Sequence, residues 1–289
     1  MAHLDQAMGE FSGFAFHMNQ QDAEARRWMP SPLLYASAAT HVGAAAAVLA
    51  RPHVWPWAIG AVAANHILLA AAGLWPRSQI LGPNWTRLPA REGVASTVAI
   101  TIDDGPEPEV TPQVLAQLEQ YRARATFFCV GERVLRYPDL AQEIVRRGHV
   151  IENHSQRHRH NFSLLGPSRM NEEIARAQDS IFRITGSIPK FFRAPAGLRN
   201  PFLDPVLSRL RLRLASWTRR GFDTVSGDAD AVFRRLTHAL QPGDILLLHD
   251  GHAARSRGGT AVILEVLPRL LELLSSRSLN PVTLRSALP

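Results

Sequence analysis

Two adjacent carboxylates, Asp103 and Asp104, follow the apolar run 98–102 directly and are themselves followed by Gly105 and Pro106. Carboxylates side by side at the end of a buried strand repel each other, so they need a cation, a proton or a paired partner. Such a pair could hold a metal ion and act as an acid or a base. An aspartate before Gly-Pro is also common in turns, and these residues alone leave both interpretations open.

Two histidines stand four residues apart: His154 ends a predicted strand over 149–154, and His158 follows it. Imidazoles at this spacing share one face of a helical turn and can converge on one metal ion. The chain has 12 histidines, and the nearby His160 shows how easily such pairs arise by chance. Two imidazoles and one carboxylate nevertheless form a ligand set that zinc accepts while it keeps positions open for water and substrate.

Two further polar residues belong to apolar runs. Arg193 lies in a predicted strand over 190–194, where a guanidinium could clamp a carboxylate or simply bridge to a surface acid. His249 follows the apolar residues 245–248 and ends a predicted strand over 244–249, where an imidazole could be a general acid or base, or a hydrogen-bonded core residue. Function concentrates at the carboxyl ends of strands in α/β folds, so these residues are candidates for one common site.

The motifs D-D-G-P, H-S-x-x-H, R-x-P-x-G and L-L-H-D occur in this order along residues 97–285. Together with a partial motif around Asp223, they resemble the NodB-type polysaccharide deacetylases, also called carbohydrate esterase family four. The resemblance implies that Asp103 is the catalytic base and His249 the catalytic acid. It also implies a divalent metal ion, expected to be Zn²⁺, with the ligands Asp104, His154 and His158.

The same resemblance implies three supporting roles. Arg193 would orient the base, Asp223 would pair with the catalytic histidine, and the backbone N–H of Ala196 would stabilise the oxyanion. This sequence departs from the family at two places: Ala196 stands where an aromatic residue is usual, and Thr224 follows Asp223 where the family has Trp. The loss of both aromatic side chains argues against a long groove for a polysaccharide.

The elements that must position these residues alternate regularly from Thr97 onward. Alternating strands and helices predict a parallel sheet, open or closed into a barrel. The resemblance implies a distorted (β/α) barrel. Expected strands span 97–102, 125–130, 149–154, 190–194, 213–218, 244–249 and 280–284, and expected helices span 110–121, 133–147, 168–184, 228–240 and 260–276.

Two uncharged apolar segments precede this domain, from Ser31 to Ala50 and from Val54 to Trp75. At about 1.5 Å per residue, each reaches roughly the 30 Å of a bilayer core. We expect a transmembrane helical hairpin, with two buried helices of a soluble protein as the alternative. The expected organisation is a polar tail over 1–30, the hairpin over 31–75, a linker over 76–96 and the catalytic domain over 97–289.

More arginines flank the hairpin than lie in its turn. The positive-inside rule then places the catalytic domain in the cytoplasm, attached to a bacterial-type inner membrane by two transmembrane helices. The periplasm is the alternative location. The flanking residues are Arg26, Arg27, Arg77, Arg87 and Arg91, against Arg51 in the turn.

The formal net charge of +7 and the pI of about 10.7 favour an anionic partner. Nearly all of this charge is arginine, since Lys190 is the only lysine, and the chain has no basic block, so nucleic-acid binding is not expected. Cys129 is the single cysteine, which excludes a disulfide within the chain. The composition predicts no oligomeric state.

The predicted function is metal-dependent hydrolysis of an N-acyl amide, acetyl or formyl, on an amino sugar. A cytoplasmic domain cannot reach the polymeric cell wall, so the expected substrate is a lipid-linked sugar whose phosphate could meet Arg199, Arg219 or Arg220. One alternative is an extracytoplasmic deacetylase of peptidoglycan or exopolysaccharide. Another is an inactive deacetylase-like membrane binding protein, which the complete set of matched site residues disfavours.

Overall fold

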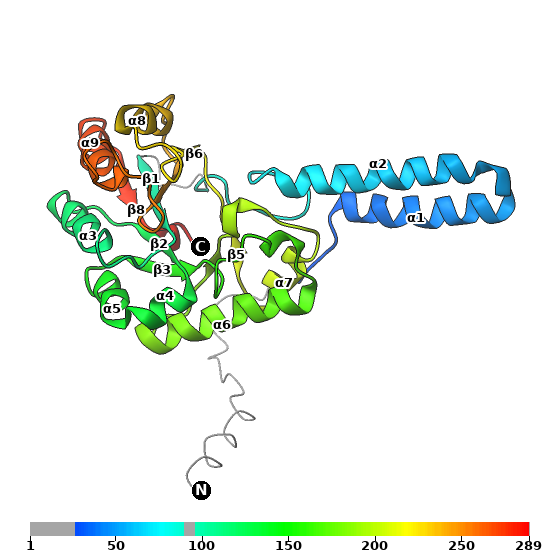
Figure 1. The fold of residues 1–289 in the computed structure, drawn as a ribbon, viewed down its shortest axis with the longest axis horizontal. Coiled ribbons are helices and arrows are strands. Elements are labelled where there is room, and N and C mark those ends of the chain that lie inside the picture. The colour runs from blue at the N-terminus through cyan, green and yellow to red at the C-terminus, as the bar shows by residue number, and fades with distance from the viewer. Residues whose placement is uncertain (1–26, 90–95, 289) are drawn as a thin grey trace, which may run out of the picture.

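The computed structural model describes residues 27–89 and 96–288, so most of the predicted tail over 1–30 lies outside the described residues. Figure 1 shows two parts: a hairpin of two long helices that projects to one side, and an α/β domain with helices around its sheet. The hairpin consists of α1 (Pro32–Ala50) and α2 (Trp55–Leu74), joined by a 3-10 turn over Pro52–Val54.

Both hairpin helices are long and apolar enough to cross a membrane, and the rest of the described protein barely covers them. Only 6% of the most apolar window of α1 is buried, and 17% of the corresponding window in Pro52–Leu74. Apolar helices of a soluble domain are normally buried in its core. The hairpin therefore does not fit the alternative of two buried helices.

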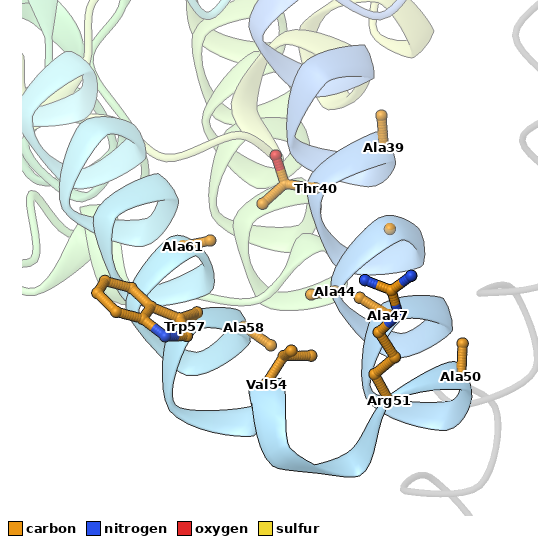
Figure 2. Close-up of a pocket in the computed structure, with 11 residues that line it drawn as sticks. Ala39, Thr40, Ala44, Ala47, Ala50, Arg51, Val54, Trp57, Ala58 and Ala61 are labelled. Carbon is orange, nitrogen blue, oxygen red and sulfur yellow. The ribbon is translucent and has the colours of Figure 1, made fainter.

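A few polar side chains join the two helices. Asn65 donates to Ser37 Oγ at 2.9 Å, and the Nε2 atoms of His41 and His66 lie 3.2 Å apart. Toward the turn, α1 and α2 leave a groove of about 590 Å³ that is lined mainly by small residues (Figure 2). Arg51 is the one titratable side chain in this groove, which therefore offers no acid–base chemistry.

The domain contains one sheet of parallel strands in the order β5-β4-β3-β2-β1-β7-β6, with β8 also paired to β1. The pairing ends at β5 on one side and β6 on the other, so the curled sheet is a part-closed barrel. This architecture confirms the predicted fold class. The strands are β1 (Thr97–Asp103), β2 (Thr126–Cys129), β3 (Val150–Asn153), β4 (Phe191–Phe192), β5 (Arg213–Leu214), β6 (Arg219–Arg220), β7 (Ile245–His249) and β8 (Asn280–Val282).

Some predicted boundaries were wrong. The helix expected over 133–147 is interrupted at Tyr137, because Pro138 lacks an N–H and disfavours a helical conformation in the residue before it. Of the strand expected over 213–218 only Arg213–Leu214 forms, while the short strand Arg219–Arg220 and one helix after residue 202 were not predicted. The helices are α3 (Thr111–Gln120), α4 (Gly131–Arg136), α5 (Pro138–Arg146), α6 (Pro167–Thr185), α7 (Leu203–Arg209), α8 (Ala229–Thr237) and α9 (Val262–Ser276).

The two faces of β1 and β7 have different partners. Ile100 and Leu246 belong to the cluster that packs under the outer helices, whereas Ala99 and Leu247 belong to a second cluster on the inner face. Side chains of a strand alternate between faces, so Asp103 and His249 have the same parity as the inner-face residues. The register also places Asp103 opposite His249. Both polar residues therefore point inward at the same end of the sheet.

Residues 76–89 run along the domain between the hairpin and the first strand. Trp85 N–H donates to Leu214 O and Trp85 O accepts from Ser216 N–H, which adds this segment to the edge of the sheet beside β5. Closer to the hairpin, Arg199 N–H donates to Gly73 O at 3.1 Å. The inner end of α2 is thus hydrogen-bonded to the loop that follows β4.

Candidate active site

The site begins where β1 ends, with the carboxylate of Asp103. Arg193, at the end of β4, donates from Nη1 to Asp103 Oδ1 at 2.6 Å, and both side chains are almost fully buried. The predicted contact of Arg193 with a carboxylate is therefore present, and the alternative of a bridge to a surface acid is wrong. This ion pair holds the Asp103 carboxylate in one orientation.

Arg193 is itself fixed by other partners. Its Nη1 also donates to Thr101 Oγ1 at 2.7 Å, its Nη2 to Ser216 O at 2.7 Å and its Nε to Ala215 O at 3.2 Å. The guanidinium lies 4.1 Å from the centre of the Phe128 ring. Each of these donors has a partner, so the buried cation is held in one orientation toward Asp103.

Three side chains could hold a metal ion: Asp104, His154 and His158, whose donor atoms all lie within 4.8 Å of one another. Asp104 Oδ1 lies 3.3 Å from His154 Nε2 and 3.1 Å from His158 Nε2. Ligand atoms around a tetrahedral zinc are separated by about 3–3.5 Å. Asp104 Oδ1 is also buried without a hydrogen-bond partner. The three residues fit a bound divalent cation.

The two histidines do not lie on a helical turn, so that part of the prediction was wrong. They follow β3 in a loop, in which Ser155 and His158 have positive φ angles of 65° and 48°. Ser155 Oγ accepts the His158 N–H at 3.0 Å and stabilises this bend. His154 Nδ1 lies 2.8 Å from Arg193 O, to which it can donate, and this leaves its Nε2 free as a ligand.

The protonation of these groups suits a cation site. Burial raises the pKa of Asp104, but its close contacts with the His154 and His252 imidazoles outweigh burial and hold that pKa well below its usual value. Burial, and secondarily the neighbouring His154, lower the pKa of His158 to about 4. An ionised carboxylate and a neutral imidazole are the forms that bind metal.

On the opposite side of Asp103, His249 is paired with Asp223. Its Nδ1 lies 2.9 Å from Asp223 Oδ1, and both residues are buried. Burial lowers the pKa of His249, but the charge of Asp223 and the hydrogen bond to it prevail and raise that pKa to about 9. His249 is thus protonated at neutral pH, which a general acid requires.

These groups meet in a cleft of about 560 Å³. Ala196, which lies in a 3-10 turn with φ 54°, is exposed at its wall. Arg193 and Asp223 do not line the cleft themselves. Arg193 is hydrogen-bonded to Asp103 and Asp223 to His249, and these two partners line it. The cleft thus brings together all the predicted site residues, of which Asp103, Asp104, His154, His158, Ala196 and His249 line it directly.

Two of the cleft residues that were not predicted bear on its chemistry, His252 and Trp217. His252 Nδ1 lies 3.4 Å from Asp104 Oδ2, and its ring stacks against His158 at 6.4 Å between centroids. Trp217 lines the cleft and supplies an aromatic wall that the motif comparison did not anticipate. His252 follows the L-L-H-D motif by two residues, and this position next to the motif could have indicated that His252 belongs to the site.

Only one of the three arginines expected near a phosphate lines the cleft. Arg199 is buried below the hairpin and donates to Ser78 O, and Arg219 binds Asp244 at 3.0 Å. Both have structural partners away from the cleft, so their expected role was wrong. Arg220 alone of the three lines the cleft.

The cleft thus combines a metal-capable triad, a buried carboxylate paired with an arginine and a protonated histidine, which are groups that a metal-dependent hydrolase requires. Residues 90–215 match the sequence model of the Polysaccharide deacetylase family. A peptidoglycan-N-acetylglucosamine deacetylase of Bacillus cereus is 35% identical over 175 residues, which are 60% of this chain and 81% of that protein. A chitooligosaccharide deacetylase of Azorhizobium caulinodans is 33% identical over 189 residues, 63% of this chain and 90% of that protein.

A solved structure agrees with these sequence comparisons. The crystal structure of a peptidoglycan N-acetylglucosamine deacetylase superposes with a TM-score of 0.64 at 26% identity, over 71% of this chain and 92% of that one. The chain belongs to the polysaccharide deacetylase family, carbohydrate esterase family four. It is accordingly a hydrolase that acts on amide bonds.

Proposed function

We propose that this protein removes an acetyl or formyl group from the nitrogen of an amino sugar in a metal-dependent reaction. One observation carries the proposal: Asp103, the triad of Asp104, His154 and His158, and the protonated His249 line the same cleft. The composition of the triad, two imidazoles and one carboxylate, favours Zn²⁺ as the ion. When bound, such an ion polarises an amide carbonyl and makes water more acidic.

The residues of the chain then divide the proton transfers. Asp103, oriented by Arg193, takes the proton from the attacking water. The backbone N–H of Ala196, exposed at the cleft wall, donates to the oxygen on which negative charge develops. His249 gives its proton to the departing amine and so completes the cleavage of the C–N bond.

We further propose that the hairpin spans a bacterial inner membrane and that the catalytic domain lies on the cytoplasmic side. The length, apolarity and exposure of α1 and α2 support the membrane, and the excess of arginines outside the turn supports the orientation. The substrate of a cytoplasmic domain would be a lipid-linked amino sugar. The hydrogen bond between Gly73 and Arg199 holds the domain close to the end of the hairpin, which suits a substrate held in the membrane.

The activity is tested with the purified full chain in detergent, loaded with Zn²⁺. We expect release of acetate or formate from an N-acylated amino sugar, and loss of that release in Asp103→Asn. Release of neither acid from any lipid-linked or free amino sugar would reject the proposal. Unchanged function of Asp103→Asn in cells would instead favour a binding protein without catalysis.

A second candidate is an extracytoplasmic deacetylase of peptidoglycan or exopolysaccharide, favoured by the named activity of the Bacillus cereus relative. Reporter fusions after Trp75 and at the C-terminus separate the two candidates. Cytoplasmic reporter activity at both positions is expected for the lipid-linked substrate. Periplasmic activity at both positions would replace it with the second candidate.

A further inference from the structure

Arg220 has an unusual position among the arginines of the cleft. It ends the short strand β6, pairs in register with Leu247 of β7 and is half-buried where it lines the cleft. His249 follows Leu247 by two residues, about 7 Å further along the strand. A group bound at Arg220 and an amide bond at His249 could therefore belong to one compact substrate.

The charge of Arg220 is not neutralised by the protein. In the described ranges it makes no ion pair, and its Nε is buried without a hydrogen-bond partner. By contrast, Arg133 of the same cleft binds Glu107 at 2.6 Å and Arg157 binds Glu132 at 3.0 Å. Buried polar groups nearly always have partners in folded proteins, so the missing acceptor points to a ligand.

Two aromatic rings hold the Arg220 side chain in place. Its guanidinium lies 5.3 Å from the ring centre of Trp217 and 4.9 Å from that of Phe222. Cation–π contacts of this kind position a guanidinium without consuming its N–H donors. A planar fork of free donors is the group that binds phosphate or carboxylate most specifically.

This wall of the cleft is also the one next to the hairpin. A Cβ atom on Gly197 would lie 2.5 Å from the Trp217 ring and 2.7 Å from Pro76, so both side chains pack against this glycine. Pro76 comes two residues after the end of α2. An anion at Arg220 would accordingly lie on the membrane side of the cleft, where the phosphate of a lipid-linked sugar would be.

We propose that Arg220 is a specificity-determining residue that binds the phosphate of a lipid-linked N-acyl amino sugar. This inference rests on the proposed function and adds the residue that recognises the phosphate of the substrate. It predicts that the enzyme distinguishes phosphorylated from neutral sugars through this one side chain. Arg136 also lines the cleft, makes no ion pair among the described residues, and adds positive charge that attracts such an anion.

The test compares kcat/KM for N-acetylglucosamine 1-phosphate and for methyl N-acetylglucosaminide, with the full chain in detergent. We expect the wild type to prefer the phosphorylated sugar by about tenfold or more, the worth of a charged hydrogen bond. Arg220→Gln should bring this ratio close to one. Arg220→Met keeps an apolar side chain over both rings, and it replaces Arg220→Gln in the test if that variant does not fold. Arg234→Gln removes one exposed charge of α8 outside the cleft, and it should keep the wild-type ratio.

An unchanged ratio in the Arg220 variants would overturn the proposal, including the case in which both rates fall equally because the wall is damaged. If neither sugar nor the prenyl-linked form is hydrolysed, the proposed function fails, and calorimetric binding of glucosamine 1-phosphate decides the role of Arg220 separately. Binding that is at least about tenfold weaker in Arg220→Gln supports the site, and equal binding rejects it. A further arm uses the same sugar phosphate linked to a prenyl alcohol in phosphatidylcholine vesicles. Preference for that form supports the lipid source, and preference for the free sugar phosphate overturns it.

Discussion

The Asp223 carboxylate holds His249 with both of its oxygens. Oδ1 lies 2.9 Å from the ring Nδ1, and Oδ2 accepts the backbone N–H of His249 at 2.7 Å. Asp223 is completely buried, so its charge acts on the imidazole with little screening by water. This pair fixes the orientation of the ring and leaves Nε2 as the nitrogen that can serve the cleft.

Asp223→Asn should move the alkaline limit of activity to lower pH. The general acid must be protonated, so the wild type is active below the His249 pKa of about 9 and loses activity above it. In the variant the carboxylate charge is gone and burial still disfavours the imidazolium, which lowers that pKa by about 1–3 units. The pH dependence of kcat/KM measures the shift. Glu272→Gln, at an exposed position of α9, should leave the profile unchanged. An alkaline limb at the same pH in both variants would contradict the role of Asp223.

The same pKa shift has a consequence for stability. Because the pKa of His249 in the folded protein exceeds its ordinary value of 6.5, protonation of this ring stabilises the fold. That contribution is complete below about pH 6.5 and is lost as the pH rises through about 9. The free energy of unfolding of the wild type should fall over this interval, and Asp223→Asn should show a smaller fall.

Asp103→Asn should abolish turnover and keep metal binding. The amide cannot accept the proton of water, and loss of a general base costs about 10²–10⁴ in kcat. Asp103 lies outside the triad of candidate ligands, so zinc should raise the Tm of this variant as much as that of the wild type. Thermal unfolding with and without Zn²⁺, together with acetate release, separates the two effects. A lost zinc response would show that Asp103 is itself a ligand.

Zinc should stabilise the wild type, and Asp104→Asn or His154→Ala should remove this effect. A ligand at about 100 times its Kd contributes about 2.7 kcal/mol, or about 5–10 °C in Tm for a domain of this size. Chelation should return the wild type to its metal-free Tm and stop the reaction. His160→Ala, which changes a neighbouring histidine outside the triad, is the matched control. An equal zinc response in all three variants would place the ion elsewhere.

Gly197→Ala should destabilise the protein more than Gly186→Ala. Both glycines have left-handed φ angles, 73° and 69°, so any side chain costs about 1–2 kcal/mol at either position. A Cβ at Gly186 meets no atom within 4 Å, whereas at Gly197 it would collide with Trp217 and Pro76. Overpacking adds about 1–3 kcal/mol, and it should also displace the neighbouring Ala196 amide and lower kcat. Denaturant unfolding of the two variants measures the difference in their free energies of unfolding. Equal free energies would refute the collision at Gly197.

The amino-acid sequence alone determined the features that depend on neighbouring residues. The apolar runs before Asp103 and His249 predicted two buried strands, and the alternation of strands and helices predicted a parallel sheet. Adjacent parallel strands bring their carboxyl ends to one edge, so Asp103, His154 and His249 could be expected at one site, whereas Asp223 and the Ala196 amide were implied only by the resemblance to the family. The length and composition of the two uncharged segments predicted the helical hairpin in the same way.

Only the tertiary structure decided how these residues are paired. Arg193 meets Asp103 across 90 positions of the chain, and Asp223 meets His249 across 26. The positive φ angles that bring His158 beside His154, and the choice of Arg220 over Arg219 for the cleft wall, depend on loop geometry and on the curl of the sheet. Local propensity does not encode these contacts, because the distance between two such residues does not follow from their separation along the chain. The packing of the whole sheet sets that distance.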